Sequence, residues 1–369
     1  MPRSKDPYLL HRTALRPLLP NVAPSALEQA WDNVASIGED RFIHFLLAQG
    51  LGPSWDEFIN RCPTVCQFSK SNLAILHNSR LTATADYLLQ KNCLDQTSQI
   101  LVAANIRHAV IKGLHTRERY FPRPALRVAV DQDVLIVPRD RVKAIRAFQK
   151  EGFTFRGVPE NISHECSLIN GKRNIDLHWD VLRPGRTRMP MAPRILGTTM
   201  DYGSHWGPDD NATLYLLLVH SVFAKYLTTP HASLIRLLDL AYVLEKSEID
   251  WDVVLDWLYN SGLKTAAWLT FTWFQILTNI SISDFVYSEL KPGHIKTRYL
   301  ESWLNNDLSS RWQDNNLLMQ LGFTLIAHDQ VADSWRAAFA ARSCRKSGPE
   351  MLESLGEELT LVAASNMKT

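Results

Sequence analysis

The apolar residues of this chain follow two different patterns. In residues 1–105 they recur three and four positions apart, as in Leu27, Trp31 and Val34, and this spacing places them on one face of a helix. The same spacing returns in residues 205–369. We therefore predict an N-terminal helical region and a C-terminal helical domain with these bounds.

Residues 106–204 lie between these two parts and contain short apolar runs separated by turn-forming residues. The runs cover residues 108–111, 134–137, 153–155, 167–169 and 175–179. A helical spacing at residues 142–148 interrupts them. Strands broken by one or two helices are typical of a small α/β or α+β core, which we predict for residues 106–204.

Helix-breaking residues subdivide the helical parts. We expect breaks at Gly50–Pro53, at Lys291–Gly293 and at Gly348–Pro349, because proline and glycine weaken or end a helix. Asp250 precedes an apolar helical pattern, and its short carboxylate side chain makes it a good N-cap. Residues 265–283 carry no charge but contain threonine, asparagine and glutamine, so a buried core helix is favoured over a transmembrane span.

The composition narrows the class of protein. Of the 369 residues 46% are hydrophobic and 21% are charged, which is enough to bury a sizeable core and excludes a disordered chain. The net charge of +2 excludes a histone-like nucleic-acid binder, and we do not expect long nucleic acid as a partner. The five scattered cysteines indicate a reducing compartment. We expect a cytoplasmic protein without a membrane partner.

The charge is unevenly distributed. Residues 106–190 contain 17 Lys/Arg and 9 Asp/Glu, a balance of +8, whereas the remainder holds 23 Lys/Arg and 29 Asp/Glu, a balance of −6. One basic segment in a nearly neutral protein suggests a local anionic ligand such as a nucleoside triphosphate. A solvated basic face explains the same composition equally well.

Three aspartates carry the candidate chemistry. Asp131 and Asp133 are two residues apart in a predicted strand, so they share one face, and Asp176 belongs to a later strand. Carboxylates placed together raise one another's proton affinity unless a cation neutralises them, and Mg²⁺ prefers oxygen ligands together with substrate phosphates. Three carboxylates on neighbouring strands suit two metal ions about 3.5–4 Å apart, the arrangement used for in-line displacement at phosphorus.

Each of these residues also has a purely structural interpretation. Asp131 and Asp133 taken alone fit a strand edge at the protein surface, and Asp176 fits a hydrogen-bonded carboxylate at a strand end. His178 shares a strand face with Asp176, and we interpret it as a packed, hydrogen-bonded histidine rather than a ligand. Arg236 and Asp239 are three apart on a predicted helix, where we favour a structural ion pair over substrate contact.

The motifs together resemble a known family. Val110-Ile-Lys112-Gly113, Arg127, Asp131-x-Asp133-Val-Leu-Ile-Val137 and Ile175-Asp176-Leu-His178-Trp179 are similar to the uncharacterised nucleotidyltransferase family of the DNA polymerase β-like superfamily. The resemblance runs from about residue 95 to 280 and includes a leucine-rich helix that carries His220. Members commonly occur in bacterial gene clusters for peptide natural products, lasso peptides among them, which implies a role in such biosynthesis.

The resemblance implies an α+β fold, a small mixed sheet flanked by helices, with Asp131, Asp133 and Asp176 as the catalytic, metal-binding triad. Lys112 and Gly113 occupy the helix-starting turn that contacts phosphate in the superfamily. Arg127 is placed to reach the β- or γ-phosphate, unless it is a surface arginine in a basic run.

Three positions depart from the family's pattern. Leu114 stands where better-studied branches have serine, so a hydroxyl contact to phosphate is lost. Val130 replaces a small residue and Gln132 an apolar one, and Val130 is bulky enough to crowd a triphosphate.

The function implied is a two-metal, Mg²⁺-dependent nucleotidyltransferase. It would move a nucleoside monophosphate from a triphosphate, ATP being expected, to a hydroxyl or similar group of a small molecule, peptide or protein, with release of pyrophosphate. Two alternatives stay open: a catalytically degenerate nucleotide-binding or assembly protein, which Val130 and Gln132 favour, and a metal-dependent hydrolase.

Overall fold

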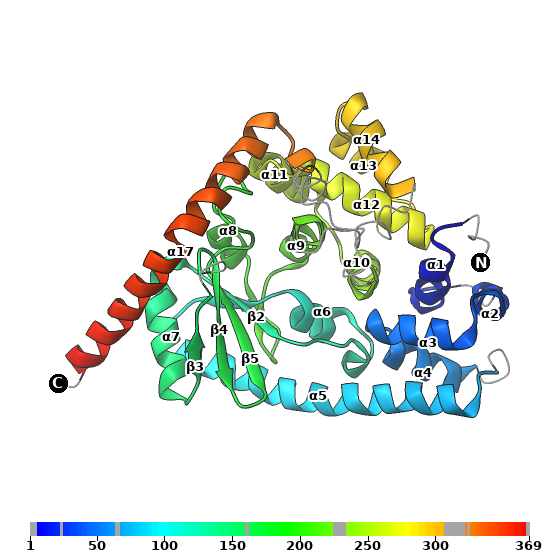
Figure 1. The fold of residues 1–369 in the computed structure, drawn as a ribbon, viewed down its shortest axis with the longest axis horizontal. Coiled ribbons are helices and arrows are strands. Elements are labelled where there is room, and N and C mark those ends of the chain that lie inside the picture. Colours follow the sequence, from blue (N-terminus) through cyan, green and yellow to red (C-terminus); the bar gives the residue numbers. More distant parts are fainter. Residues whose placement is uncertain are drawn as a thin grey trace.

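The fold is a small mixed β-sheet surrounded by helices, in agreement with the predicted α+β class (Figure 1). The computed structural model describes residues 6–22, 25–62, 67–158, 162–223, 234–305, 322 and 325–366. The division at residues 105 and 204 stays a prediction. One hydrophobic cluster extends from Tyr8 to Ala327 and joins helices that precede the sheet in the sequence with helices that follow it.

Five strands form the sheet, in the order β1-β2-β5-β4-β3. They are β1 (His108–Val110), β2 (Gln132–Ile136), β3 (Thr154–Arg156), β4 (Glu165–Asn170) and β5 (Arg173–His178). Strands β2 and β5 run parallel, whereas the other neighbours are antiparallel. Each predicted run of apolar residues thus corresponds to a strand. A separate two-stranded ribbon consists of β6 (Met200–Asp201) and β7 (Trp206–Gly207).

The two faces of β2 pack against different cores. Val134 and Ile136 belong to one hydrophobic cluster, with residues of α5, α7 and α17. Leu135 belongs to the larger cluster, to which most other helices and the N-terminal part of α5 contribute. Side chains alternate along a strand, so Asp133 faces the same side as Leu135, and Gln132 faces the same side as Val134. This alternation decides which residues of β2 reach the candidate site.

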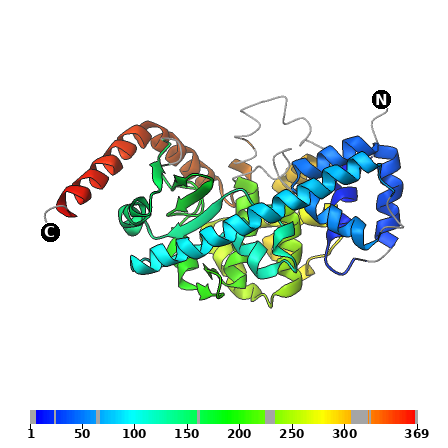
Figure 2. The same ribbon diagram turned by 90° about the horizontal axis from the view of Figure 1, so that it is seen from below.

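The helices before and within the sheet region have the following bounds: α1 (Leu9–Leu15), η1 (Arg16–Leu18), α2 (Ser25–Ile37), α3 (Glu39–Ala48), α4 (Gly52–Arg61), α5 (Lys70–Ala103), α6 (Lys112–Tyr120), η2 (Pro124–Leu126), η3 (Pro138–Asp140), α7 (Arg141–Lys150) and α8 (Ala192–Gly197). Helix α5 crosses the molecule from the N-terminal helices to the sheet (Figure 2). Its buried Leu76 joins the larger cluster, and its buried Leu101 joins the core under β2.

The helices after the sheet are α9 (Asp210–Phe223), α10 (Ile235–Lys246), α11 (Trp251–Ser261), α12 (Lys264–Thr278), α13 (Asp284–Leu290), α14 (His294–Asn305) and α17 (Val331–Asn366). Asp250 caps α11 as predicted, since its carboxylate accepts hydrogen bonds from the backbone N–H groups of Asp252 and Val253. The uncharged stretch forms α12, most of whose residues are buried in the core. Within the described residues, no helix combines the length and the hydropathy needed to cross a membrane.

The predicted helix breaks hold at two positions and fail at the third. Helix α4 begins at Gly52, and α14 follows α13 after Lys291–Gly293. The break at Gly348–Pro349 is wrong, because α17 continues through Pro349. Leu355 and Leu359 are buried in the core under the sheet and hold the helix in place beyond the proline, so packing offsets the lost backbone hydrogen bond.

Candidate active site

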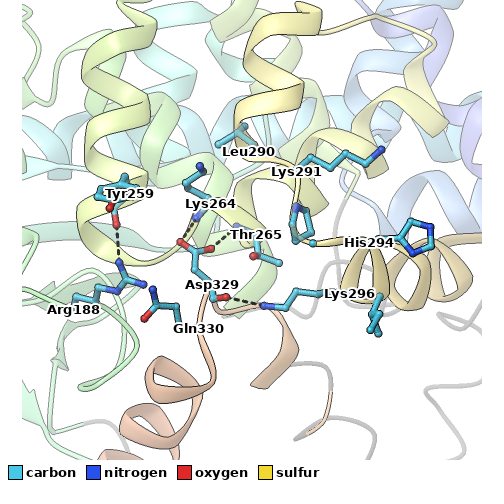
Figure 3. A pocket seen from close by; sticks show the side chains of 13 residues that line it. Arg188, Tyr259, Lys264, Thr265, Leu290, Lys291, His294, Lys296, Asp329 and Gln330 are labelled. Carbon is cyan, nitrogen blue, oxygen red and sulfur yellow. Dashed lines mark hydrogen bonds between the residues drawn. The ribbon is translucent and has the colours of Figure 1, made fainter.

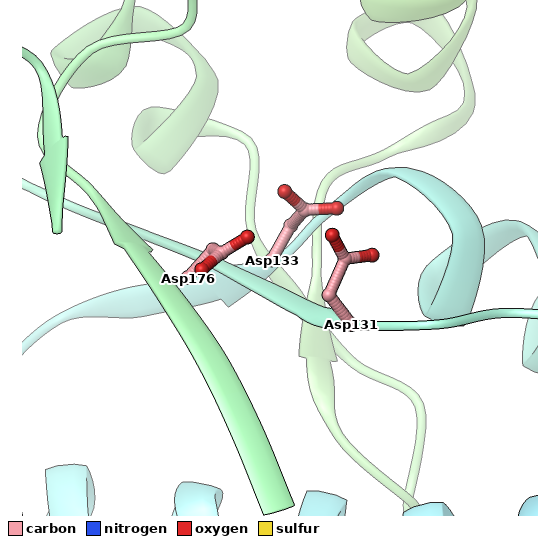
Figure 4. Close-up of side chains that lie close together, drawn as sticks. All are labelled: Asp131, Asp133 and Asp176. Carbon is pink, nitrogen blue, oxygen red and sulfur yellow. The ribbon is translucent and has the colours of Figure 1, made fainter. Parts of the chain in front are cut away.

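The three predicted aspartates converge on one face of the sheet, at its interior strands β2 and β5 (Figure 4). Because β2 and β5 are parallel and in register, Asp133 lies directly beside Asp176, and Asp131 lies just before the start of β2. Each contributes a carboxylate oxygen to a group in which all three atoms lie within 4.8 Å of one another. The sequence therefore predicted correctly which three carboxylates come together, while their catalytic and metal-binding roles stay predictions.

Asp133 lies at the centre of a charged network. Lys112 donates from Nζ to Asp133 Oδ1 at 2.7 Å, and His178 Nε2 lies 2.8 Å from the same oxygen. On its other side the His178 ring places Nδ1 3.0 Å from Glu165 Oε2. Burial disfavours the ionised form of Asp133, but Lys112 and His178 outweigh it and hold the pKa of Asp133 well below its usual range.

The pKa of Asp131 shifts in the opposite direction. Burial, followed by the neighbouring charges of Asp133 and Asp176, raises the pKa of Asp131 to about 6. The ammonium group of Lys112 only partly offsets this effect. The cluster thus holds more negative charge than the surrounding side chains neutralise, which is the condition that favours a bound cation.

The turn between β1 and α6 directs Lys112 into the cluster. Lys112 is the first residue of α6 and has φ of +57°, a left-handed conformation that is uncommon for a residue with a side chain. We expected Lys112 to neutralise a triphosphate, and in the structure its ammonium group contacts Asp133 and approaches His178 Nε2 at 3.4 Å. Strained backbone of this kind occurs often at functional sites.

Arg127 is buried, so its interpretation as a surface arginine is wrong. It is 7% exposed, and it donates to both oxygens of Asp239, from Nε at 3.0 Å and from Nη2 at 2.6 Å. Its third nitrogen, Nη1, donates to the carbonyl of Val128 at 2.7 Å. The ion pair expected between Arg236 and Asp239 is also wrong, because Asp239 pairs with Arg127 across the fold. Bidentate pairing to a carboxylate uses the same donors that would bind phosphate.

Gly113 provides the space for this pair. A Cβ atom built on Gly113 would lie 2.5 Å from Arg127 Nη1. The glycine that was expected to contact phosphate therefore also lets α6 pass close to the Arg127 guanidinium group.

Arg236 is a cation of the site that the sequence reasoning did not assign to it. Its Nη1 lies 2.8 Å from His220 Nδ1, and within the described residues it forms no ion pair with a carboxylate. Burial and the neighbouring Lys112 and Arg236 lower the pKa of His220, so its neutral ring accepts this hydrogen bond. No spacing signal in the sequence distinguishes Arg236 from a residue of a structural ion pair.

Two cavities meet at the carboxylates. One, of about 500 Å³, extends from Gly113 and Arg127 towards apolar side chains of α9 and α10. The other, of about 360 Å³, extends past Asp176 towards the segment that follows β5. Both are lined by Lys112, Asp131, Asp133, His220 and Arg236. We call them the α9–α10 cavity and the Asp176 cavity.

A third cavity, of about 630 Å³, lies away from this site and has several cationic side chains (Figure 3). Arg188 and Lys296 have internal partners, and Arg188 donates to both carboxylate oxygens of Asp333. Asp329 accepts from the backbone N–H groups of Lys264 and Thr265 at the start of α12, and Lys296 donates to the carbonyls of His328 and Asp329. We therefore place the candidate active site at the carboxylates and not in this third cavity.

The departures from the family pattern do not block the carboxylates. Leu114 is buried against Leu94 and Val110 and fills core space. Gln132 faces away from the site and accepts a hydrogen bond from Thr97 of α5. Val130 lines the α9–α10 cavity but is 84% exposed, so it lies at the cavity's rim.

The comparison with known protein families gives one result. A family model described as "Uncharacterised nucleotidyltransferase" matches residues 35–279. This range contains every residue of the site described above. No curated protein matches the chain.

Replacing Gly113 by Ala tests the close approach between α6 and Arg127. The added methyl group meets a guanidinium that Asp239 holds in place, so we expect a loss of about 1–3 kcal/mol in the free energy of unfolding, measured by urea denaturation. Gly197→Ala in α8 is the matched control, because its Cβ meets nothing within 4 Å. A Gly113→Ala protein as stable as the control would contradict a rigid pair.

Replacing Asp131 by Asn tests the excess negative charge. The folded-state pKa of Asp131, about 6, is above the unfolded value, so ionisation costs stability as the pH rises from about 4 to above 6. In metal-free buffer at pH 8 the variant should be more stable than wild type by about 1–3 kcal/mol, and the difference should vanish near pH 4. The exposed control Asp86→Asn should show no such trend. A variant that is less stable at pH 8 would exclude charge repulsion at this site.

Proposed function

Because the chain belongs to the uncharacterised nucleotidyltransferase family, we propose that it is a Mg²⁺-dependent enzyme that moves a nucleoside monophosphate from a triphosphate, ATP being expected, to an acceptor hydroxyl or similar group and releases pyrophosphate. The observation that carries this proposal is the convergence of Asp131, Asp133 and Asp176 within 4.8 Å. We propose peptide natural-product biosynthesis as its setting, on the family resemblance alone.

The donor set of the cluster fits Mg²⁺. All three candidate ligands are carboxylates. Burial and the neighbouring charges of Asp133 and Asp176 raise the pKa of Asp131, and a bound cation would stabilise its ionised form. Asp131 and Asp133 would hold both ions, and Asp176 would hold the ion nearer the acceptor. When bound, the ions supply charge stabilisation for the phosphates and for the attacking oxygen. Ser167 donates to Asp176 Oδ1 at 2.7 Å and so fixes the orientation of that carboxylate.

Two cations of the chain would neutralise the triphosphate. Lys112 keeps the role expected of it, and in the structure its ammonium group lies beside Asp133. Arg236 takes the place that the sequence suggested for Arg127, because Arg127 is engaged by Asp239 whereas Arg236 lines both cavities. Arginine presents several donors in one plane and suits phosphate oxygens.

The two cavities would divide the substrates between them. The α9–α10 cavity contains the start of α6 and Gly113, where the superfamily resemblance places the phosphates, and its apolar wall of Leu216, Leu217 and Ile235 suits a base and sugar. The Asp176 cavity would take the acceptor, because Asp176 lines this cavity and does not line the other.

One observation favours a second candidate, a binding protein without turnover. In the structure Lys112 neutralises Asp133, so part of the negative charge is balanced without a metal ion. Such a protein would bind a triphosphate and release no pyrophosphate. Gln132, in contrast, gives this candidate no support, because its side chain lies on the other face of β2.

The two candidates differ in turnover. The full chain with Mg²⁺ and α-³²P-labelled triphosphates, incubated with an extract of small molecules and peptides, should transfer label to an acceptor and release one pyrophosphate for each label. Asp176→Asn should keep most of its affinity for Mg²⁺–triphosphate and lose at least about 10²-fold in transfer rate, since it removes a positioned base. Asp180→Asn, two residues after the end of β5 and outside both cavities, is the control.

If wild type binds triphosphate without releasing pyrophosphate, the second candidate holds. If Asp176→Asn keeps the wild-type rate, Asp176 is a structural carboxylate.

A further inference from the structure

The Asp176 cavity has a basic wall opposite the carboxylates. Beyond the residues that both cavities share, its charged groups include Arg183 and Arg186, which follow β5. Arg183 is exposed at the rim, and Arg186 is half-buried. Neither of these two residues lines the α9–α10 cavity.

Arg186 is held in a defined position. It donates from Nη1 to the carbonyl of Phe223, the last residue of α9, at 2.6 Å, and its guanidinium lies over the Phe223 ring at 5.6 Å from the centroid. Phe223 is itself 1% exposed, so it forms a rigid support. A guanidinium that is positioned in advance loses less conformational entropy on binding a ligand than a mobile surface side chain.

The acidic groups of this cavity already have roles. Asp131, Asp133 and Asp176 form the cluster, and Glu165 faces His178 at 3.0 Å. When cations occupy the cluster, its carboxylates are neutralised, and the wall formed by Arg183 and Arg186 makes the cavity electropositive. A neutral or cationic acceptor gains nothing from such a wall, whereas an anionic one does.

We propose that the acceptor carries an anionic group, a phosphate or a carboxylate, which Arg183 and Arg186 bind while Asp176 faces the acceptor's hydroxyl. This inference rests on the proposed function and names the substrate class of the same site. A phosphorylated or carboxylate-bearing small molecule or peptide satisfies it, and a cationic amine does not.

The transfer step balances with this arrangement. The acceptor hydroxyl oxygen forms a bond to the α-phosphorus, and the bond from that phosphorus to the β-phosphate oxygen breaks. Pyrophosphate leaves with the electron pair, and the hydroxyl proton passes to the Asp176 carboxylate and from there to water. The acceptor's anionic group takes no part in the chemistry and serves to position the hydroxyl.

Three small probes that share hydroxyl groups test the proposal without knowledge of the natural acceptor: glycerol, glycerate and glycerol 3-phosphate. Their binding is measured by calorimetry on the full chain saturated with Mg²⁺ and a non-hydrolysable triphosphate. We expect glycerol 3-phosphate or glycerate to bind at least tenfold more tightly than glycerol, and the stronger of the two identifies the anionic group as phosphate or carboxylate.

Charge-removing variants locate the binding group. Arg183→Gln and Arg186→Gln should each weaken the anionic probe about tenfold and change triphosphate affinity less than about twofold, on the scale of a lost charge-assisted contact. Arg186→Lys keeps the charge and should restore part of the affinity. Arg194→Gln is the matched control, because Arg194 pairs with Asp256 outside the cavity. Circular dichroism shows whether each variant folds. If Arg186→Gln does not fold, Arg183→Gln still tests the proposal, because Arg183 is exposed.

Several results would overturn the proposal. Equal binding of glycerol and its anionic relatives would do so, as would anion binding that both arginine variants leave unchanged. Loss of triphosphate binding in these variants would assign the basic wall to the triphosphate instead. Failure of the proposed function is a different result. If the protein binds anions selectively but releases no pyrophosphate, catalysis is contradicted. If it turns over with no preference for anionic acceptors, only this inference is contradicted.

Discussion

Parallel pairing of β2 with β5 brings Asp133 beside Asp176, and this places three carboxylates where their charges repel. Neighbouring side chains partly offset that repulsion. Lys112 adopts a left-handed backbone conformation at the start of α6 and contacts Asp133, while His178 bridges Asp133 and Glu165. Burial and the negative charges of Asp133 and Asp176 raise the pKa of Asp131 to about 6. Ionisation of Asp131 therefore costs stability unless a cation neutralises the cluster.

The basic character of residues 106–190 has a second explanation besides ligand binding. Many of its arginines form ion pairs with acidic residues of the helical parts, which carry the opposite charge balance. These pairs are Arg119–Asp210, Arg123–Glu57, Arg127–Asp239, Arg141–Glu358 and Arg188–Asp333. Buried pairs such as Arg127–Asp239 fix how the helices lie on the sheet core, whereas exposed ones contribute little. The cationic groups at the two cavities account for only part of the surplus positive charge of residues 106–190.

Periodicity predicted the five strands and the shared face of Asp131 and Asp133, because side-chain alternation is a local property that the sequence contains. The family resemblance implied that Asp176 completes the triad. Contacts between distant segments were not predictable in this way. Arg127 and Asp239 are 112 positions apart, so nothing in the local pattern shows that Asp239 pairs with Arg127 rather than with Arg236 on its own helix. Glu165 was missed because its role depends on the register of β4 against β5, which places it opposite His178. Pro349 was misinterpreted because the packing of Leu355 and Leu359 overrides a local helix breaker.

The central claim is that the three aspartates form a two-metal site for a triphosphate. Electron paramagnetic resonance with Mn²⁺ in place of Mg²⁺ tests it directly, because it counts bound ions and detects magnetic coupling between neighbouring ions. With a non-hydrolysable triphosphate present, the account predicts two coupled Mn²⁺ ions per chain in wild type and a single, uncoupled ion in Asp176→Asn. Two uncoupled ions, or the same spectrum in both proteins, would contradict it.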